Sequence, residues 1–169
     1  MAVRVPDRSR EALPPARLAQ FLAQSGIDHE FVAPGVPMPT VSAAAAALGV
    51  PEAAILKTLV FEAPDGSCVI AVASGPNRVD RRKLAAVVGV PRLVLASPET
   101  VLRVTGYPAG GVAPVGHATA IQVIVDRAVL DLSVAWGGAG DESLLLRIDP
   151  SDIVRLTDGV VADIQVDPT

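Results

Sequence analysis

The sequence has few aromatic residues, 3%, and a single cysteine, Cys68, among its 169 residues. One cysteine excludes an internal disulfide and any multi-cysteine zinc site. There is also no apolar run long enough to span a bilayer and no apolar signal core at the N-terminus. We therefore expect a cytoplasmic protein without a membrane partner. Its core must be built mainly from Ala, Val, Leu and Ile, since hydrophobic residues still make up 50%.

Positive charge is also scarce, because the formal net charge is −4. This balance excludes a generally basic nucleic-acid coat and predicts no DNA partner, so an anionic partner must be met by a local patch. The densest basic cluster consists of Arg78, Arg81, Arg82 and Lys83. It can contact tRNA phosphates, although a solvated helix face explains the same pattern equally well.

The chain length fits one domain over residues 1–169, with residues 1–10 expected to be flexible. The strongest local pattern is a hairpin of strands 53–61 and 68–73 around the turn Pro64-Asp65-Gly66-Ser67. Cap and stop residues predict helices between Pro14 and Gly26, Thr40 and Gly49, Asp80 and Gly89, Ser97 and Gly106, and after Asp149-Pro150. Further strands are expected at 27–32, 120–125, 132–136, 143–148 and 160–166. This order favours a compact α+β fold with a mixed, largely antiparallel sheet surrounded by short helices.

Lys57 lies in an apolar strand and is one of only two lysines. Strand alternation places it on one face with Ile55, Leu59 and Phe61. An ammonium on such a face is unfavourable by several kcal/mol unless it has a partner or borders a wet pocket, which makes Lys57 a site candidate. The alternative is an edge-strand lysine whose stem lies along apolar surface.

The segment from Thr105 to His117 holds four glycines and two prolines. Glycines let the backbone bend and approach a ligand, and prolines fix the bends, so unpaired N–H groups can face a carbonyl or phosphate oxygen. The segment matches neither a phosphate-binding P-loop nor a dinucleotide fingerprint, because no helix pattern follows it. A plain surface crossover is the alternative interpretation.

Several segments occur together in one order: Thr40 with the Ala-rich helix and Leu48-Gly49-Val50, then Ile55 to Val60, Asp80 to Leu84, Thr105-Gly106-Tyr107, Gly110 to Gly116, Val125-Asp126 and Gly137 to Gly140. Over residues 25–166 this order resembles the YbaK/proline-tRNA synthetase editing-domain family of aminoacyl-tRNA deacylases. The resemblance implies a YbaK-like, half-barrel-like sheet. It further implies hydrolysis of the ester between a wrong amino acid and the terminal ribose of a tRNA, without metal or cofactor.

The resemblance also implies roles for individual residues. Lys57 matches the essential lysine of the family, and Gly110 and Gly111 belong to the loop that lines the site with backbone groups. The implied substrate-binding residues are Thr58, Tyr107, Val112, Ala113, Pro114, Gly116 and His117. At Ala113 many members carry a hydroxyl residue, so a role for that hydroxyl does not transfer. If the substrate is a tRNA, the local charge of Arg78, Arg81, Arg82 and Lys83 makes this cluster the candidate contact to its phosphates.

The chemistry of the residues agrees with this family. No Ser-His-Asp context or metal-ligand cluster is recognisable, and Cys68 alternates within an apolar strand, so a protein nucleophile has little support. Backbone N–H groups and Lys57 can instead fix the ester for attack by water or by a thiol of the substrate. His117 can touch substrate or make a structural hydrogen bond, and Tyr107 and Trp136 can stack on a terminal adenine or cap the core.

With no synthetase catalytic or anticodon-binding portion in the sequence, we expect an editing factor acting in trans. Its partners would be mischarged tRNA, such as Cys-tRNA(Pro) or Ala-tRNA(Pro), and a cognate aminoacyl-tRNA synthetase. A rival hypothesis is a non-catalytic nucleotide-binding, tRNA-binding or regulatory module that keeps the pocket. A third is a hydrolase for another small ester or thioester.

Overall fold

The predicted hairpin forms the centre of the fold, which a computed structural model describes for residues 12–168. Strand β2 (Leu56–Glu62) pairs antiparallel with β3 (Cys68–Ser74), so Lys57 lies opposite Ala73. The side chain of Asp65 closes the turn by accepting hydrogen bonds from the backbone N–H and the hydroxyl of Ser67. The predicted hairpin and its turn are confirmed, although the first strand begins only at Leu56, because a 3₁₀ turn occupies Glu52–Ala54.

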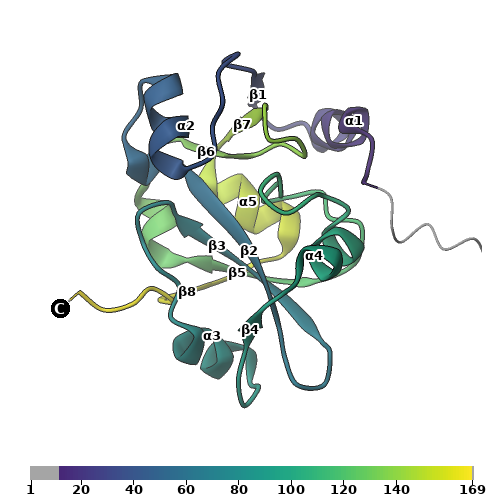
Figure 1. Cartoon of the computed structure of the whole chain (residues 1–169), viewed down its shortest axis with the longest axis vertical. Coiled ribbons are helices and arrows are strands. Elements are labelled where there is room, and N and C mark those ends of the chain that lie inside the picture. The colour runs from purple at the N-terminus through teal and green to yellow at the C-terminus, as the bar shows by residue number, and fades with distance from the viewer. Residues whose placement is uncertain (1–11, 169) are drawn as a thin grey trace, which may run out of the picture.

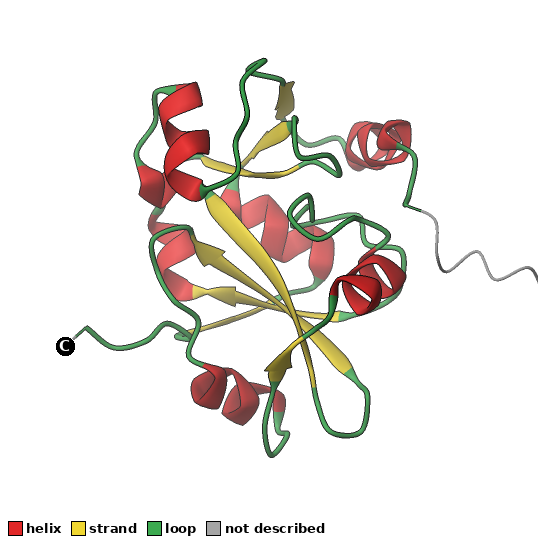
Figure 2. Ribbon diagram, in the orientation of Figure 1, coloured by secondary structure: helices red, strands yellow, loops and turns green. Residues whose placement is uncertain are grey.

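Two sheets are built around this hairpin (Figures 1 and 2). The larger has the order β4-β2-β3-β5-β8, with β4 (Val94–Leu95), β5 (Gln122–Asp126) and β8 (Val160–Ala162); the β3–β5 and β5–β8 pairs are parallel. The smaller is antiparallel, with the order β1-β7-β6, from β1 (His29–Val32), β7 (Leu145–Ile148) and β6 (Ala135–Gly138). A parallel bridge between Ile55 and Trp136 links the two sheets. The α+β class with a mixed sheet is confirmed, although the strands form two bridged sheets.

Short helices surround the sheets, as the sequence predicted. They are α1 (Pro15–Ser25), α2 (Val41–Leu48), α3 (Arg81–Val88), α4 (Pro98–Thr105) and α5 (Pro150–Thr157). The four later helices begin at a side chain that accepts a backbone N–H, supplied by Thr40, Asp80, Ser97 and Asp149. The first four helices end at a glycine in the left-handed conformation. Among the described residues no helix combines the length and apolarity needed to cross a membrane.

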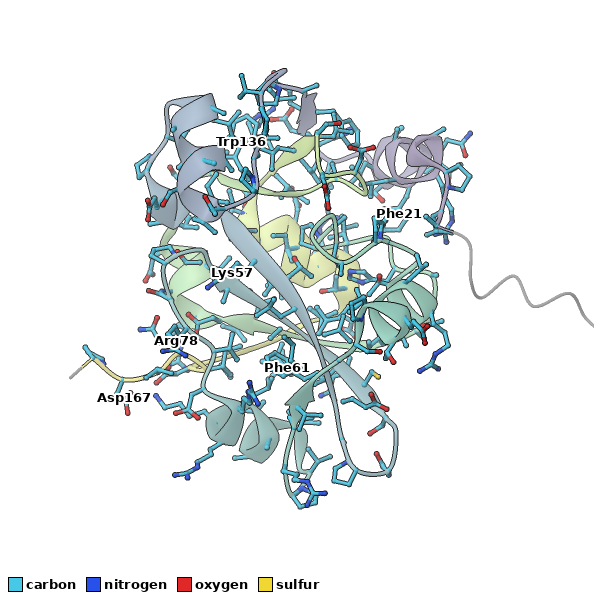
Figure 3. All side chains as sticks on the ribbon, in the orientation of Figure 1. Phe21, Lys57, Phe61, Arg78, Trp136 and Asp167 are labelled. Atoms are coloured by element: carbon cyan, nitrogen blue, oxygen red, sulfur yellow. The ribbon has the colours of Figure 1, made fainter. Side chains whose placement is uncertain are left out.

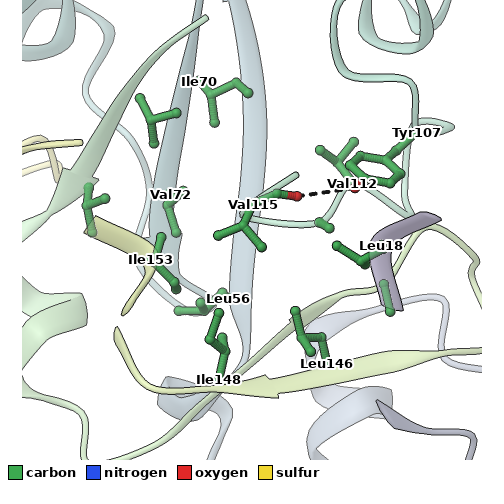
Figure 4. Close-up of a cluster of buried hydrophobic side chains, with 14 of the residues drawn as sticks. Leu18, Leu56, Ile70, Val72, Tyr107, Val112, Val115, Leu146, Ile148 and Ile153 are labelled. Carbon is green, nitrogen blue, oxygen red and sulfur yellow. Dashed lines mark hydrogen bonds between the residues drawn. The ribbon is translucent and has the colours of Figure 1, made fainter. Parts of the chain in front are cut away.

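The two faces of β2 contribute to different cores. Leu56 and Val60 point into the main core, where they meet side chains of α1, α4, α5 and the smaller sheet (Figure 4). Leu59 and Phe61 belong to the opposite face, which α3 covers through Leu84. Lys57 therefore shares the α3 side of the sheet, as strand alternation predicted.

Several predicted boundaries need correction. The strand expected at 132–136 begins only at Ala135, because the 3₁₀ turn Arg127–Asp131, capped by Asp126, follows β5 directly. The strand expected at 160–166 ends at Ala162. The two-residue strand β4 carried no period-2 signal and was missed. The prediction for residues 1–10 lies outside the described residues.

Candidate functional site

One pocket of about 220 Å³ lies beside β2. Four segments surround it: β2, the start of α2 with the loop before it, the glycine-rich loop, and the turn between β6 and β7. Its lining residues are Met38, Pro39, Thr40, Val41, Ala44, Ile55, Leu56, Lys57, Thr58, Leu59, Gly110, Val112, Gly138, Asp141, Glu142, Leu144 and Leu145. The pocket thus brings together Lys57, Thr58, Gly110 and Val112 from the set predicted from the sequence.

The pocket forms where one edge of β2 has no paired strand beside it. The bridge to β6 is at Ile55, and pairing with β4 begins only at Phe61. Val60 directs its carbonyl to that outer edge, where it accepts from Ala96 N–H. Because backbone groups alternate between the edges of a strand, Thr58 also directs its N–H and C=O outward. The hydroxyl Oγ1 of Thr58 is buried and has no hydrogen-bond partner among the described residues.

Lys57 lines this pocket without a counter-ion (Figure 3). Among the described residues no carboxylate lies within salt-bridge distance of its ammonium. Burial lowers the pKa of Lys57 below its ordinary value, and the positive charge of Arg78 lowers the pKa further. An anionic or carbonyl oxygen entering the pocket would meet an unneutralised cation there.

The glycine-rich loop contributes Gly110 and Val112 to the pocket that Lys57 also lines. Neither of these two residues has an acceptor for its N–H among the described residues. Gly110 has φ +89°, a left-handed conformation that favours glycine. These two donors can form an oxyanion hole.

Gly111, in contrast, cannot supply its N–H to a substrate. That group donates to Pro108 O at 2.9 Å, and the Gly111 carbonyl accepts from Gly140 N–H at 2.8 Å. Gly111 is buried behind the pocket wall. The sequence-based assignment of Gly111 as a backbone donor is therefore corrected, because its two backbone groups are bonded within the protein and hold the loop against the turn at Gly140.

Tyr107 does not reach the pocket either. Its side chain is 3% exposed, and its hydroxyl lies 2.8 Å from Gly116 O and 3.2 Å from Val115 O as a donor (Figure 4). Burial raises the pKa of Tyr107 to about 12. The predicted contact with substrate is corrected to a role in the core, because this ring is packed on every side.

His117 lies behind the loop as well. Its Nε2 donates to Ala113 O at 2.8 Å, and burial lowers the pKa of its imidazole. With Gly116 it lines a separate cavity of about 190 Å³ near Phe21 and Leu156. The substrate-binding assignments of His117 and Gly116 are therefore corrected to support of the loop.

Ala113 and Pro114 are buried and do not line the pocket. A Cβ on Gly137 would lie 3.1 Å from Pro114 Cδ, so Pro114 packs closely on β6. A Cβ on Gly138 would lie only 2.4 Å from Val112 O. Glycines at 137 and 138 thus allow β6 and the loop to approach each other, and direct substrate contacts by Ala113 and Pro114 are also corrected.

The basic cluster divides into members with different surroundings. Lys83 is held by Asp163 at 3.1 Å and Asp167 at 2.6 Å, so its predicted availability for tRNA is corrected. Arg78 is exposed and close enough to Lys57 to lower its pKa. Arg81 and Arg82 are exposed along a different groove at α3.

Part of the pocket wall was not identified from the sequence. Met38, Val41, Ala44, Leu144 and Leu145 supply apolar surface, and Asp141 and Glu142 place two carboxylates at its border. Apolar wall residues look like ordinary core in a sequence, so only the acidic pair after the Gly137 to Gly140 bend offered a signal. Hydrogen bonds from Ser143 lower the pKa of Asp141 and keep it ionised.

Two further features bear on the chemistry. Cys68 lies opposite Glu62, at the other end of the hairpin from Lys57, and burial raises the pKa of its thiol. Trp136 packs with Ala44 and Ile55, and does not line the pocket. No three His, Cys, Asp or Glu side chains within residues 12–168 are arranged to hold a metal ion.

Comparison with known proteins identifies the family. The model of the aminoacyl-tRNA editing domain matches residues 36–156, so the chain belongs to this family. Over 104 residues it is 38% identical to a proline--tRNA ligase of Geobacter sulfurreducens, covering 60% of this chain and 18% of that protein. The chain spans less than a fifth of the length of such ligases.

Two shorter proteins match over most of their own length. A protein of Enterococcus faecalis provisionally named Cys-tRNA(Pro)/Cys-tRNA(Cys) deacylase EbsC is 28% identical, over 71% of this chain and 73% of that protein. A solved structure provisionally described as a trans-editing enzyme for prolyl-tRNA synthetase has a TM-score of 0.77 and 32% identity, covering 93% of this chain and 100% of that chain. The YbaK-like fold and the family resemblance are confirmed, and the comparisons support an aminoacyl-tRNA editing function.

Proposed function

We propose that this chain is a trans-acting aminoacyl-tRNA deacylase that removes a small, wrongly attached amino acid from tRNA(Pro). The observation that carries this proposal is one pocket lined by Lys57, Gly110 and Val112. Among the described residues the Lys57 ammonium has no carboxylate at salt-bridge distance, and the N–H groups of Gly110 and Val112 have no acceptor. Family membership supports the substrate class, and the names of the relatives support tRNA(Pro).

The reaction needs no nucleophile from the protein. The ester carbonyl oxygen accepts from the N–H groups of Gly110 and Val112, and these bonds strengthen as water adds to the carbonyl carbon and charge grows on the oxygen. The bond from the carbonyl carbon to the ribose oxygen then breaks, the ribose oxygen takes a proton, and the free amino acid leaves. Lys57 anchors a phosphate or carbonyl oxygen of the substrate so that the ester meets these donors.

The size of the pocket favours a small amino acid. The part beside Lys57 has a volume of about 220 Å³, below the roughly 300–1,000 Å³ typical of pockets for drug-sized ligands. A wider hollow of about 660 Å³ adjoins it and shares Met38, Pro39, Gly110 and Glu142, which leaves room for the rest of the substrate. Its apolar wall includes Val41, Ala44 and Ile55, and none of these carries a group to satisfy a charged side chain. We infer that alanine or cysteine fits, with the two carboxylates of Asp141 and Glu142 at the border.

The test is release of amino acid from tRNA(Pro) charged with alanine, cysteine, serine or proline, with the alanine methyl ester alongside. We expect release of alanine or cysteine from tRNA and little release of proline. Turnover of both alanine and cysteine supports attack by water, whereas turnover of cysteine alone supports attack by the substrate thiol. Tight binding of these tRNAs without any release would support the non-catalytic module, and faster turnover of the methyl ester would support a general esterase.

The proposed source of substrate is a prolyl-tRNA synthetase that releases mischarged tRNA. The ligases that match this chain contain a similar segment within a much longer protein. The present chain would hydrolyse the same aminoacyl ester after the mischarged tRNA has left the synthetase.

A further inference from the structure

A second hollow lies at α3, outside the Lys57 pocket. Arg81 and Arg82 of α3 and Arg92 after it line a groove of about 410 Å³. All three arginines are exposed, and none has a carboxylate at salt-bridge distance within the described part of the chain. In a chain with a net charge of −4, this groove concentrates unneutralised positive charge.

The groove lies on the same side of the larger sheet as Lys57. Leu59 and Phe61 share the Lys57 face of β2, and α3 packs on them through Leu84. The four residue-to-residue steps from Lys57 to Phe61 span about 13 Å of strand. Arg78 lies near enough to Lys57 to lower its pKa, and in Figure 3 it stands beside the C-terminal segment at a level between Lys57 and α3. Positive groups thus continue from the pocket to the groove.

The C-terminal segment fixes this basic surface in place. Val166 N–H donates to Arg78 O at 2.8 Å, and Asp80 N–H donates to Ile164 O at 2.7 Å. The carboxylate of Asp80 accepts from backbone N–H groups at the start of α3, while Asp163 and Asp167 hold Lys83. These carboxylates therefore have partners of their own, and the arginines extend from a supported backbone.

We propose that Arg81, Arg82 and Arg92, with Arg78 between them and the pocket, bind phosphates of the acceptor stem of a tRNA whose 3′ end enters the Lys57 pocket. This inference rests on the proposed function. Arginine suits phosphate because its planar group presents several donors, and such contacts position a nucleic acid without reading its sequence. The apolar lining of the groove is Ala85, Ala86, Val90, Pro91 and Leu93. It contains no aromatic ring for stacking unpaired bases, which favours a paired stem.

The direct test measures binding of uncharged tRNA(Pro), which needs no turnover. The variant carries Arg81→Gln, Arg82→Gln and Arg92→Gln, and its matched control carries Arg17→Gln, Arg103→Gln and Arg155→Gln on α1, α4 and α5. Both lose the same charge from exposed positions. We expect the groove variant to raise Kd at least about tenfold and to reduce the slope of log Kd against log salt concentration by about one for each arginine. The control should stay within about twofold of the unmodified protein.

Equal tRNA affinity of the groove variant and the unmodified protein would overturn the inference, as would an equal loss in the control. Thermal melting checks that both fold, and single Arg92→Gln, outside α3, gives the same test with a slope change of about one. Deacylation separates this inference from the proposed function. The groove variant should raise KM for alanyl-tRNA(Pro) while hydrolysing 3′-O-alanyl-adenosine at the unmodified rate. If the unmodified protein hydrolyses neither ester while tRNA binding still depends on the groove, the proposed deacylase function is wrong and the proposed tRNA-binding surface is supported.

Discussion

His117 holds the glycine-rich loop from behind, through the 2.8 Å hydrogen bond from its Nε2 to the carbonyl oxygen of Ala113. Ala113 follows Val112, whose N–H is one of the two free donors at the pocket. The half-buried imidazole, which lies outside the Lys57 pocket, therefore helps to fix the position of a backbone donor from behind the loop. Several predictions about the site depend on this division between backbone groups that face the ester and side chains that support them.

The chain has two lysines, so the effect of replacing Lys57 in the pocket can be compared with the effect of replacing Lys83. Lys57→Ala should lower kcat/KM for mischarged tRNA by about a hundredfold or more, because it removes both charge and positioning. Lys83→Ala is the control, since Lys83 is held by Asp163 and Asp167. It should keep activity within about twofold and change the free energy of unfolding little, because an exposed ion pair is screened by solvent. Near-normal turnover by a folded Lys57→Ala protein would exclude Lys57 from the site.

Gly111→Val tests whether the loop backbone carries the reaction. A Cβ at this position would lie 3.2 Å from Asp141 N and 3.3 Å from Gly140 C, so the side chain must push the 140–141 turn and the donors apart. We expect kcat to fall about tenfold or more, measured with alanyl-tRNA(Pro). Ala109→Val, at an exposed position of the same loop, is the matched control and should change kcat little.

Cys68→Ala completes that comparison. The thiol lies at the far end of the hairpin from Lys57, so its removal should leave kcat within about twofold. An inactive Cys68→Ala protein, together with an active Gly111→Val protein, would replace the loop mechanism by a covalent thioester route.

The stability of the protein should fall in acid partly because of His117. Burial lowers the pKa of His117 in the folded protein below its ordinary value of 6.5. The unfolded chain then binds the proton more readily, so this contribution is fully present above pH 6.5 and is lost as pH falls from 6.5 toward the folded pKa. Urea unfolding across this range should show a smaller loss of stability in His117→Asn than in the unmodified protein. Equal pH dependence of the two would contradict a buried neutral His117.

Tyr107 can be followed alone, because it is the only tyrosine of the chain. Its pKa of about 12 predicts that the phenol stays protonated well past its ordinary value of 10.0 and that stability is lost as pH rises from that value. Ultraviolet absorbance of tyrosinate measures this titration, and an ordinary pKa would mean that the ring is exposed. Tyr107→Phe should lower the free energy of unfolding by about 1 kcal/mol, since Gly116 O loses its donor.

The sequence by itself determined the local structure and the class of the protein. Thr40, Asp80, Ser97 and Asp149 fixed where helices begin, because a cap depends on residues within one turn of it. The hairpin and the face of Lys57 followed from the turn residues and the period of two. The order of motifs, with Lys57 and the glycine loop among them, identified the editing-domain family.

Tertiary structure decided which groups are available. The carbonyl of Gly111 is occupied by the N–H of Gly140, and whether Lys83 is free depends on Asp163 and Asp167, about eighty residues away. Tyr107 has an aromatic ring and a hydroxyl that could bind a ligand, yet its hydroxyl donates to backbone carbonyls inside the core. The pocket itself exists because β2 lacks a neighbour between its bridge to β6 and its pairing with β4. Such pairings join segments distant in the chain, and no local pattern of residues encodes them.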